Sequence, residues 1–170
     1  MIRRILLALL CLGAAACVAT YREVEDGAAT AVIQFEKGYT TGLGFGNSAS
    51  QEYSIADDAD ALRRAAFFTW TNSDPISRRV AAGESLRLHA TTTYFYTTGV
   101  TSTGYGYYAN MANNQCNEGA TFTPQAGHTY VVTQAELSYA QCELRIVDAT
   151  TGAAPPDLSL SNAAAPKPSQ

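Results

Sequence analysis

Short stretches in which every second residue is apolar constrain the fold of this chain more than any other feature. Residues 31–36 (AVIQFE) and residues 86–90 (LRLHA) both place apolar side chains at alternate positions. Residues 129–134 and 141–148 have the same strand-forming character. Side chains alternate between the two faces of a β-strand, so this period of two predicts strands with one buried face.

Turn-forming residues separate these stretches, as in the PQAG sequence at 124–127. Charged residues make up only 15% of the chain, whereas long surface helices usually carry many Glu and Lys residues. One short helix is expected over residues 59–66, with Asp57 or Asp58 as its cap. The sequence therefore predicts an all-β fold, an antiparallel β-sandwich of about seven or eight strands, immunoglobulin-like or similar, with little helix.

The N-terminus reads as an export signal. Arg3 and Arg4 precede an apolar run that ends in small residues, which is the pattern of a secretory signal peptide over residues 1–16. The run is shorter than the roughly 20 apolar residues that a membrane-spanning helix needs.

The end of this segment, Ala14-Ala15-Ala16-Cys17, resembles the lipobox of bacterial lipoproteins, although the first position is usually Leu in that family. The resemblance covers the first seventeen residues only. It implies a diacylglycerol on the Cys17 sulfur and an acyl chain, such as palmitate, on its amine, which together anchor the protein stably. Val18 follows where Asp would favour the inner membrane, so the resemblance implies the outer membrane. The alternative is ordinary cleavage after Ala16, which leaves Cys17 unmodified.

Two of the four cysteines, Cys116 and Cys142, remain after the signal and the anchor are set aside. An even pair in an exported chain predicts a disulfide bond. The C-x-x-C spacing of a redox-active dithiol is absent, and two histidines in the whole chain give little support to a metal site. We expect no cofactor.

The chain is expected to contain one folded domain, residues 29–150. Residues 17–28 are expected to form a lipidated N-terminus and polar tether. Residues 151–170 are rich in Pro, Ala and Ser, and we expect them to be a disordered tail.

The charge of the chain argues against nucleic acid as a partner. The net charge of −4 becomes −6 once Arg3 and Arg4 leave with the signal, and no basic patch is evident. Catalysis has weak support too, because His89 and His128 have no motif that pairs them with a nucleophile. We expect a protein that is not an enzyme.

Tyrosines in a Gly-rich segment are the most informative candidates for binding. Tyr105, Tyr107 and Tyr108 lie in a stretch read as a long loop or hairpin tip, and tyrosine offers large contact area with few rotatable bonds. The alternative is that these tyrosines belong to the core or to edge strands. Two functions are consistent with this pattern. The first is an outer-membrane lipoprotein that binds a protein or glycan partner. The second is an inhibitor or immunity lipoprotein that neutralises a periplasmic hydrolase or toxin.

Overall fold

The computed structural model describes residues 20–25, 27–38, 48–56, 60–69, 71–138 and 141–162. These residues contain nine strands and no helix long and apolar enough to cross a membrane. The strands are β1 (Thr30–Phe35), β2 (Ser48–Ala56), β3 (Leu62–Phe68), β4 (Ile76–Ala81), β5 (Leu86–Thr103), β6 (Gly106–Phe122), β7 (Thr129–Ser138), β8 (Gln141–Asp148) and β9 (Ser159–Asn162).

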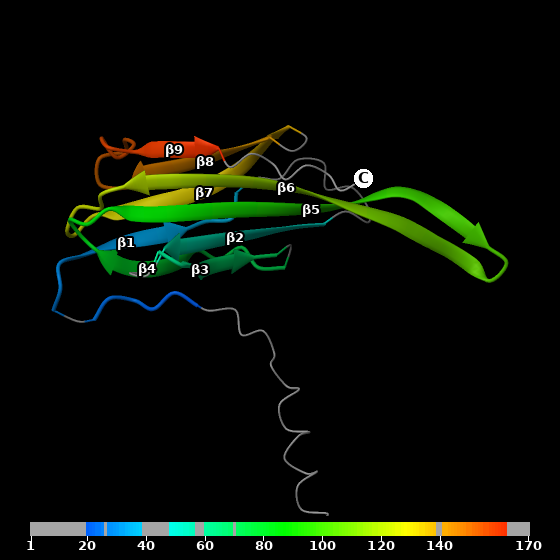
Figure 1. Ribbon diagram of the computed structural model, residues 1–170, viewed down its shortest axis with the longest axis horizontal. Helices are drawn as coiled ribbons and strands as arrows, with labels where there is room; N and C mark the ends of the chain where they lie inside the picture. The colour runs from blue at the N-terminus through cyan, green and yellow to red at the C-terminus, as the bar shows by residue number, and fades with distance from the viewer. Residues whose placement is uncertain are drawn as a thin grey trace, which may run out of the picture.

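The strands form two sheets that pack face to face, which confirms the predicted β-sandwich (Figure 1). One sheet has four strands in the order β4-β1-β7-β8, and the other has five in the order β3-β2-β5-β6-β9. All neighbouring strands are antiparallel except β1 and β7, which pair in parallel. The count of nine strands exceeds the seven or eight expected.

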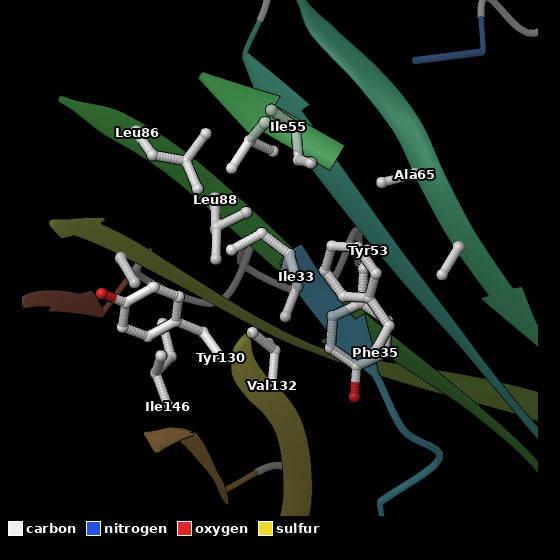
Figure 2. Packing of buried hydrophobic residues seen from close by; sticks show 14 of the residues in the cluster. Ile33, Phe35, Tyr53, Ile55, Ala65, Leu86, Leu88, Tyr130, Val132 and Ile146 are labelled. Carbon is white, nitrogen blue, oxygen red and sulfur yellow. The ribbon is translucent and has the colours of Figure 1, made fainter. Parts of the chain in front are cut away.

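The core lies between the sheets and is built from the alternate residues that the sequence pattern marked. Ile33 and Phe35 of β1 are fully buried, and Leu88 of β5 is 2% exposed. They pack against Tyr53 and Tyr130, as Figure 2 shows. Burying a large apolar side chain of this kind contributes roughly 1.5–3 kcal/mol, so this double layer is the main source of stability.

A buried polar cluster joins the two sheets at one end of this core. The Gln51 side chain on β2 donates hydrogen bonds to the Gln134 carbonyl oxygen at 2.7 Å and to the Thr92 hydroxyl at 3.1 Å. The Thr92 hydroxyl donates in turn to the Gln134 side-chain oxygen at 2.7 Å. The Gln51 side-chain oxygen accepts from the Gly38 backbone N–H at 2.7 Å. Beyond the end of β1, the Gln51 side-chain amide thus supplies the hydrogen bond to the β7 backbone that a neighbouring strand would otherwise supply.

Cys116 and Cys142 form the predicted disulfide, with their Cα atoms 6.0 Å apart. Cys116 lies on β6 and Cys142 on β8, so the bond joins the five-stranded sheet to the four-stranded one. It packs with Ala49 and Tyr94 as a small cluster separate from the main core.

The helix expected over residues 59–66 is wrong, because residues 62–68 form β3 at the edge of the larger sheet. Asp60 has a left-handed backbone conformation, with φ of 62°, which does not continue a helix. Pairing with β2 buries Ala65 and Ala66, and an isolated helix of two turns has no comparable source of stability. Asp57 and Asp58 lie outside the described residues.

The disordered tail expected from residue 151 is wrong as far as residue 162, because Ser159–Asn162 form β9 against β6. Pro155 is buried, Leu158 packs against the core, and the Asp157 carboxylate accepts the Thr123 backbone N–H at 2.9 Å. These three contacts order a segment whose composition is otherwise typical of disorder. Residues 163–170 lie outside the described part of the chain.

The N-terminal segment is also part of the domain rather than a free tether. Residues 20–23, which we call the strap, run between β3 and β4, the edge strands of the two sheets (Figure 1). The Tyr21 backbone N–H donates to the Arg64 carbonyl oxygen at 2.9 Å, and the Tyr21 hydroxyl donates to the Arg79 carbonyl oxygen at 3.3 Å. The Glu23 carboxylate accepts from Arg79 at 3.3 Å. The strap therefore closes one open side of the sandwich.

Candidate functional site

The main departure from a plain sandwich is a hairpin that projects from it. β5 and β6 are much longer than their neighbours, and their distal halves extend beyond both sheets (Figure 1). We call this projecting part, residues 96–112, the arm. The sequence predicts a long loop or hairpin tip over residues 97–114, and the structure shows a hairpin whose strands continue almost to its end.

Cross-strand pairing holds the arm together without a core of its own. The register runs from Tyr96 opposite Ala112 to Thr103 opposite Gly106, with one irregularity where Thr98 has no partner. At that bulge the Thr98 hydroxyl donates to the Asn110 carbonyl oxygen at 3.1 Å. The Asn110 side chain donates to the Thr101 hydroxyl at 2.9 Å. Both strands therefore remain joined on either side of the bulge.

One face of the arm carries a stripe of exposed apolar side chains. Directly opposed residues point to the same face of a sheet. By this rule one face continues the solvent side of β5 and β6, and it presents Phe95, Thr97 with Met111, Val100 with Ala109, and Ser102 with Tyr107. Val100 is 63% exposed and Met111 is 52% exposed. We call Val100, Tyr107 and Met111 of the arm, together with Phe95 at its base, the stripe.

The three tyrosines selected from the sequence lie at the end of the arm. Tyr105 is in the turn and fully exposed, while Tyr107 and Tyr108 are 80% and 60% exposed. Their positions differ from that of Tyr94, which is buried in the body of the sandwich. Burial and the nearby Glu136 carboxylate raise the pKa of Tyr94 to about 12. The reading of the tip tyrosines as core residues is therefore wrong, whereas Tyr107 and Tyr108 do lie on a strand, β6, that forms an edge of the arm. Whether the tyrosines bind a partner stays a prediction.

The arm also carries no side chain that is charged near neutral pH. No Asp, Glu, Lys, Arg or His occurs in residues 90–117. The sequence interpretation did not use this signal, although it is visible in the sequence. An exposed surface without charge can be desolvated at low cost, which is typical of the central part of a protein–protein interface.

The two histidines do not form a catalytic arrangement with any described nucleophile. His89 lies on the outer side of β5, and the Thr91 hydroxyl beside it, at 3.4 Å, donates instead to Asn117 at 2.8 Å. Burial lowers the pKa of His89, opposed by the Glu52 charge. Its environment is that of an ordinary strand residue.

His128 pairs with Asp148, with Nδ1 and Oδ2 2.8 Å apart. Asp148 also accepts the Thr150 backbone N–H at 2.8 Å, and the His128 ring stacks on Tyr130. Burial acts to raise the pKa of Asp148, but the bonds from His128 and Thr150 prevail and lower it. The pair fastens the turn after β8 to the start of β7. Among the described residues neither Ser nor Cys is hydrogen-bonded to His128.

A polar depression lies beside the strap. Its lining includes both positive and negative side chains: Arg22, Glu23, Glu25, Asp60, Arg63, Glu84 and Arg87. Arg87 and Asp60 neutralise each other across 2.6 Å. This mixture of opposite charges selects neither anions nor cations, so the depression gives weak support to a ligand site.

Cys17, the predicted lipidation site, lies outside the described residues. Within the described residues no cluster of three or more His, Cys, Asp or Glu side chains is arranged to hold a metal ion. The arm is thus the strongest candidate site in this part of the chain. Comparison with protein-family models, curated proteins and solved structures finds no match to this chain.

Proposed function

We propose that this protein is a lipid-anchored, non-catalytic binding protein of the bacterial outer membrane, and that its arm contacts a protein or glycan partner. The observation that carries the proposal is the group of exposed tyrosines at the end of an uncharged projecting hairpin. Grouped exposed apolar side chains often mark interaction sites, and tyrosine is enriched in binding surfaces because it supplies large contact area with little loss of entropy.

The proposed anchor and the proposed contact surface lie on different elements of the molecule. Cys17 precedes the strap, which lies against β3 and β4, whereas the arm extends from the strands β5 and β6. In Figure 1 the arm projects beyond the end of the sandwich, away from the strap. A partner can therefore approach the tip without displacing the chain that leads to the membrane.

A more specific role is the neutralisation of a hydrolase or toxin in the periplasm. The shape of the arm favours this alternative, because a projecting hairpin is complementary to a concave site, and enzyme active sites are usually concave. Tyr105 at the turn would then enter the cleft first.

The test is affinity capture from the envelope of the source organism, followed by mass spectrometry and glycan analysis. The bait is the chain with Cys17→Ser, compared with the same chain that also carries Tyr105→Ser, Tyr107→Ser and Tyr108→Ser. The matched control replaces three exposed leucines of the body instead, Leu62, Leu137 and Leu160.

We expect the tyrosine variant to lose the captured partner while the leucine control retains it. A single near-stoichiometric hydrolase or toxin supports neutralisation, whereas envelope proteins or cell-wall glycans support the broader role. Capture that is equal for both variants, or no partner above background, contradicts the proposal.

A further inference from the structure

Two carboxyl groups point into the sandwich where the disulfide bond joins β6 to β8. Glu118 alternates along β6 with the buried residues Cys116 and Ala120, and side chains two positions apart on a strand share a face. Glu136 on β7 is directly opposite Cys142 on β8, so it lies on the same face as the disulfide. Both carboxyl groups therefore lie between the sheets and not on the outer surface.

No positive charge balances these two carboxylates. The Glu118 carboxylate accepts hydrogen bonds from Gln134 Nε2, at 3.3 Å, and from the Leu144 backbone N–H. Glu136 Oε2 is buried, and no group in the described part of the chain is hydrogen-bonded to it. Among the described residues neither carboxylate forms an ion pair. The only basic residue of β6, β7 and β8, Arg145, is exposed on the outer face of β8.

The groups around the carboxylates add no positive charge either. β5 contributes the Tyr94 hydroxyl, 3.7 Å from Cys142 Sγ, and the pKa of this phenol is raised by burial and by the charges of both carboxylates. β8 contributes Glu143, whose negative charge acts to raise the pKa of Glu118. β2 packs Ala49 against the disulfide, and β9 contains no charged residue. We call this group of side chains the seam: Tyr94, Cys116, Glu118, Glu136 and Cys142.

Near neutral pH the charges of the seam oppose its closure. Two carboxylates that share a partly desolvated site repel each other, and burial raises the pKa of Glu118 above the usual 4.5. A carboxyl group whose pKa is raised by folding binds its proton more readily in the folded chain. Its unfavourable effect on stability is therefore present above the folded-state pKa, and this effect disappears as the pH falls through that pKa toward 4.5.

The disulfide bond crosses the seam at the same place. β6 and β8 belong to different sheets, so no strand pairing joins them. The bond between Cys116 and Cys142 joins them covalently and holds the sheets together against the repulsion. Closure of the sandwich on this side thus depends on the disulfide and on the protonation state of the two carboxyl groups.

We infer that the seam is a pH-dependent closure: protonation of its two carboxyl groups draws β6 and β8 together, and near neutral pH the disulfide bond holds them against the repulsion between the carboxylates. The arm continues from β5 and β6 directly beyond Tyr94 and Cys116, so this closure sets how firmly the base of the arm is held (Figure 1). The base is therefore held more firmly in mild acid. The inference concerns the body of the sandwich and goes beyond the proposed binding of a partner at the tip.

The experiment is amide hydrogen exchange on the full chain with Cys17→Ser, measured for β6 and β8 at about pH 7.5 and at about pH 4.5 and corrected for the intrinsic exchange rate. The test variant also carries Glu118→Gln and Glu136→Gln, which remove both charges with little change in shape. The matched control instead carries Glu25→Gln and Glu84→Gln, which remove two exposed charges from the depression beside the strap.

We expect protection of β6 and β8 in the parent and in the control to be about three- to tenfold higher at the lower pH, since a pKa raised by one unit changes the opening equilibrium about tenfold. In the test variant we expect equal protection at both pH values, because neither carboxyl group remains to titrate. A parent chain whose protection stays constant or falls in acid overturns the inference. A test variant that keeps the response of the parent overturns the role of these two carboxyl groups.

A second measurement removes the covalent bond. In the chain with Cys116→Ser and Cys142→Ser, we expect the same two Glu→Gln changes to raise the midpoint of urea unfolding at the higher pH and to have little effect at the lower pH, where the carboxyl groups are protonated. A midpoint that these changes leave unchanged or lower at the higher pH overturns the inference. Neither measurement involves the tip of the arm, so both results are independent of whether the tip binds a partner.

Discussion

Single buried polar residues decide how well the two sheets fit together. Gln51 is 2% exposed and Gln134 is fully buried, yet the side-chain amide of each is hydrogen-bonded. The Gln51 amide bonds the Gln134 carbonyl oxygen of the opposite sheet, the Thr92 hydroxyl of its own sheet and the Gly38 backbone N–H. The Gln134 amide bonds Thr92 and Ala90 of the opposite sheet. The Tyr53 hydroxyl completes the arrangement, since it donates to the Glu36 carbonyl oxygen at 3.0 Å and accepts the Gln134 backbone N–H at 2.9 Å. Burial raises the pKa of this phenol well above its ordinary value. Such a cluster specifies one alignment of the sheets, because any slip leaves buried polar groups unpaired.

Asp148 makes the stability of the fold depend on pH. The pKa of its carboxyl is lowered below the usual 3.8 in the folded state, so the unfolded chain binds this proton more readily. Its contribution is therefore present above about pH 4 and is lost as the pH falls through the lower, folded-state pKa. We expect Asp148→Asn to be less stable than the parent near neutral pH, with a difference that narrows below about pH 4. Urea unfolding at a series of pH values measures this, and a difference that stays constant down to pH 3 contradicts it.

At the scale of elements, the disulfide between β6 and β8 holds the sandwich closed near the base of the arm. We expect the double variant Cys116→Ser, Cys142→Ser to lose about 3 kcal/mol of unfolding free energy, because the bond closes a chain segment of 26 residues. Urea unfolding of the parent and the variant checks the value. In the folded parent both cysteines should resist alkylation until the protein is unfolded and reduced. Ready labelling of the native protein would contradict a stable bond.

Elements differ in how far the sequence could predict them. The alternation in residues 31–35 and 86–90 predicted β1 and the start of β5 with the correct buried faces, because periodicity reports burial directly. β9 was missed, because it is an edge strand made by tertiary pairing from a segment whose composition is typical of disorder. β3 was predicted only at its end: AFFTW at residues 66–70 has strand character, whereas residues 59–66 were expected to form a helix.

The candidate site was predicted in part. The tip tyrosines could be selected from composition alone, and their positions are exposed as a contact surface requires. The projection of the hairpin could not be predicted, because it depends on where β2 and β9 stop pairing with β5 and β6. Those end points are set by the rest of the fold and leave no local pattern in residues 96–112.

At the scale of the whole molecule, the proposed anchor determines where the protein resides. We expect Cys17→Ser to move the protein from the membrane fraction to the soluble periplasmic fraction, because the lipid is the only membrane attachment we propose. Fractionation and immunoblotting of both forms measure this. A variant that still partitions with membranes contradicts the lipoprotein assignment.

The strap has a mechanical consequence for a protein anchored in this way. Thr20 already bridges to Arg64 of β3, so only residues 18 and 19 separate the folded body from Cys17. Three residues at full extension span at most about 11 Å. If Cys17 carries lipid, the folded domain is held directly against the bilayer and cannot move away from it on a flexible tether. The distance from the membrane at which it can bind a partner is then set by the length of the arm, so a partner must approach the membrane surface to be bound.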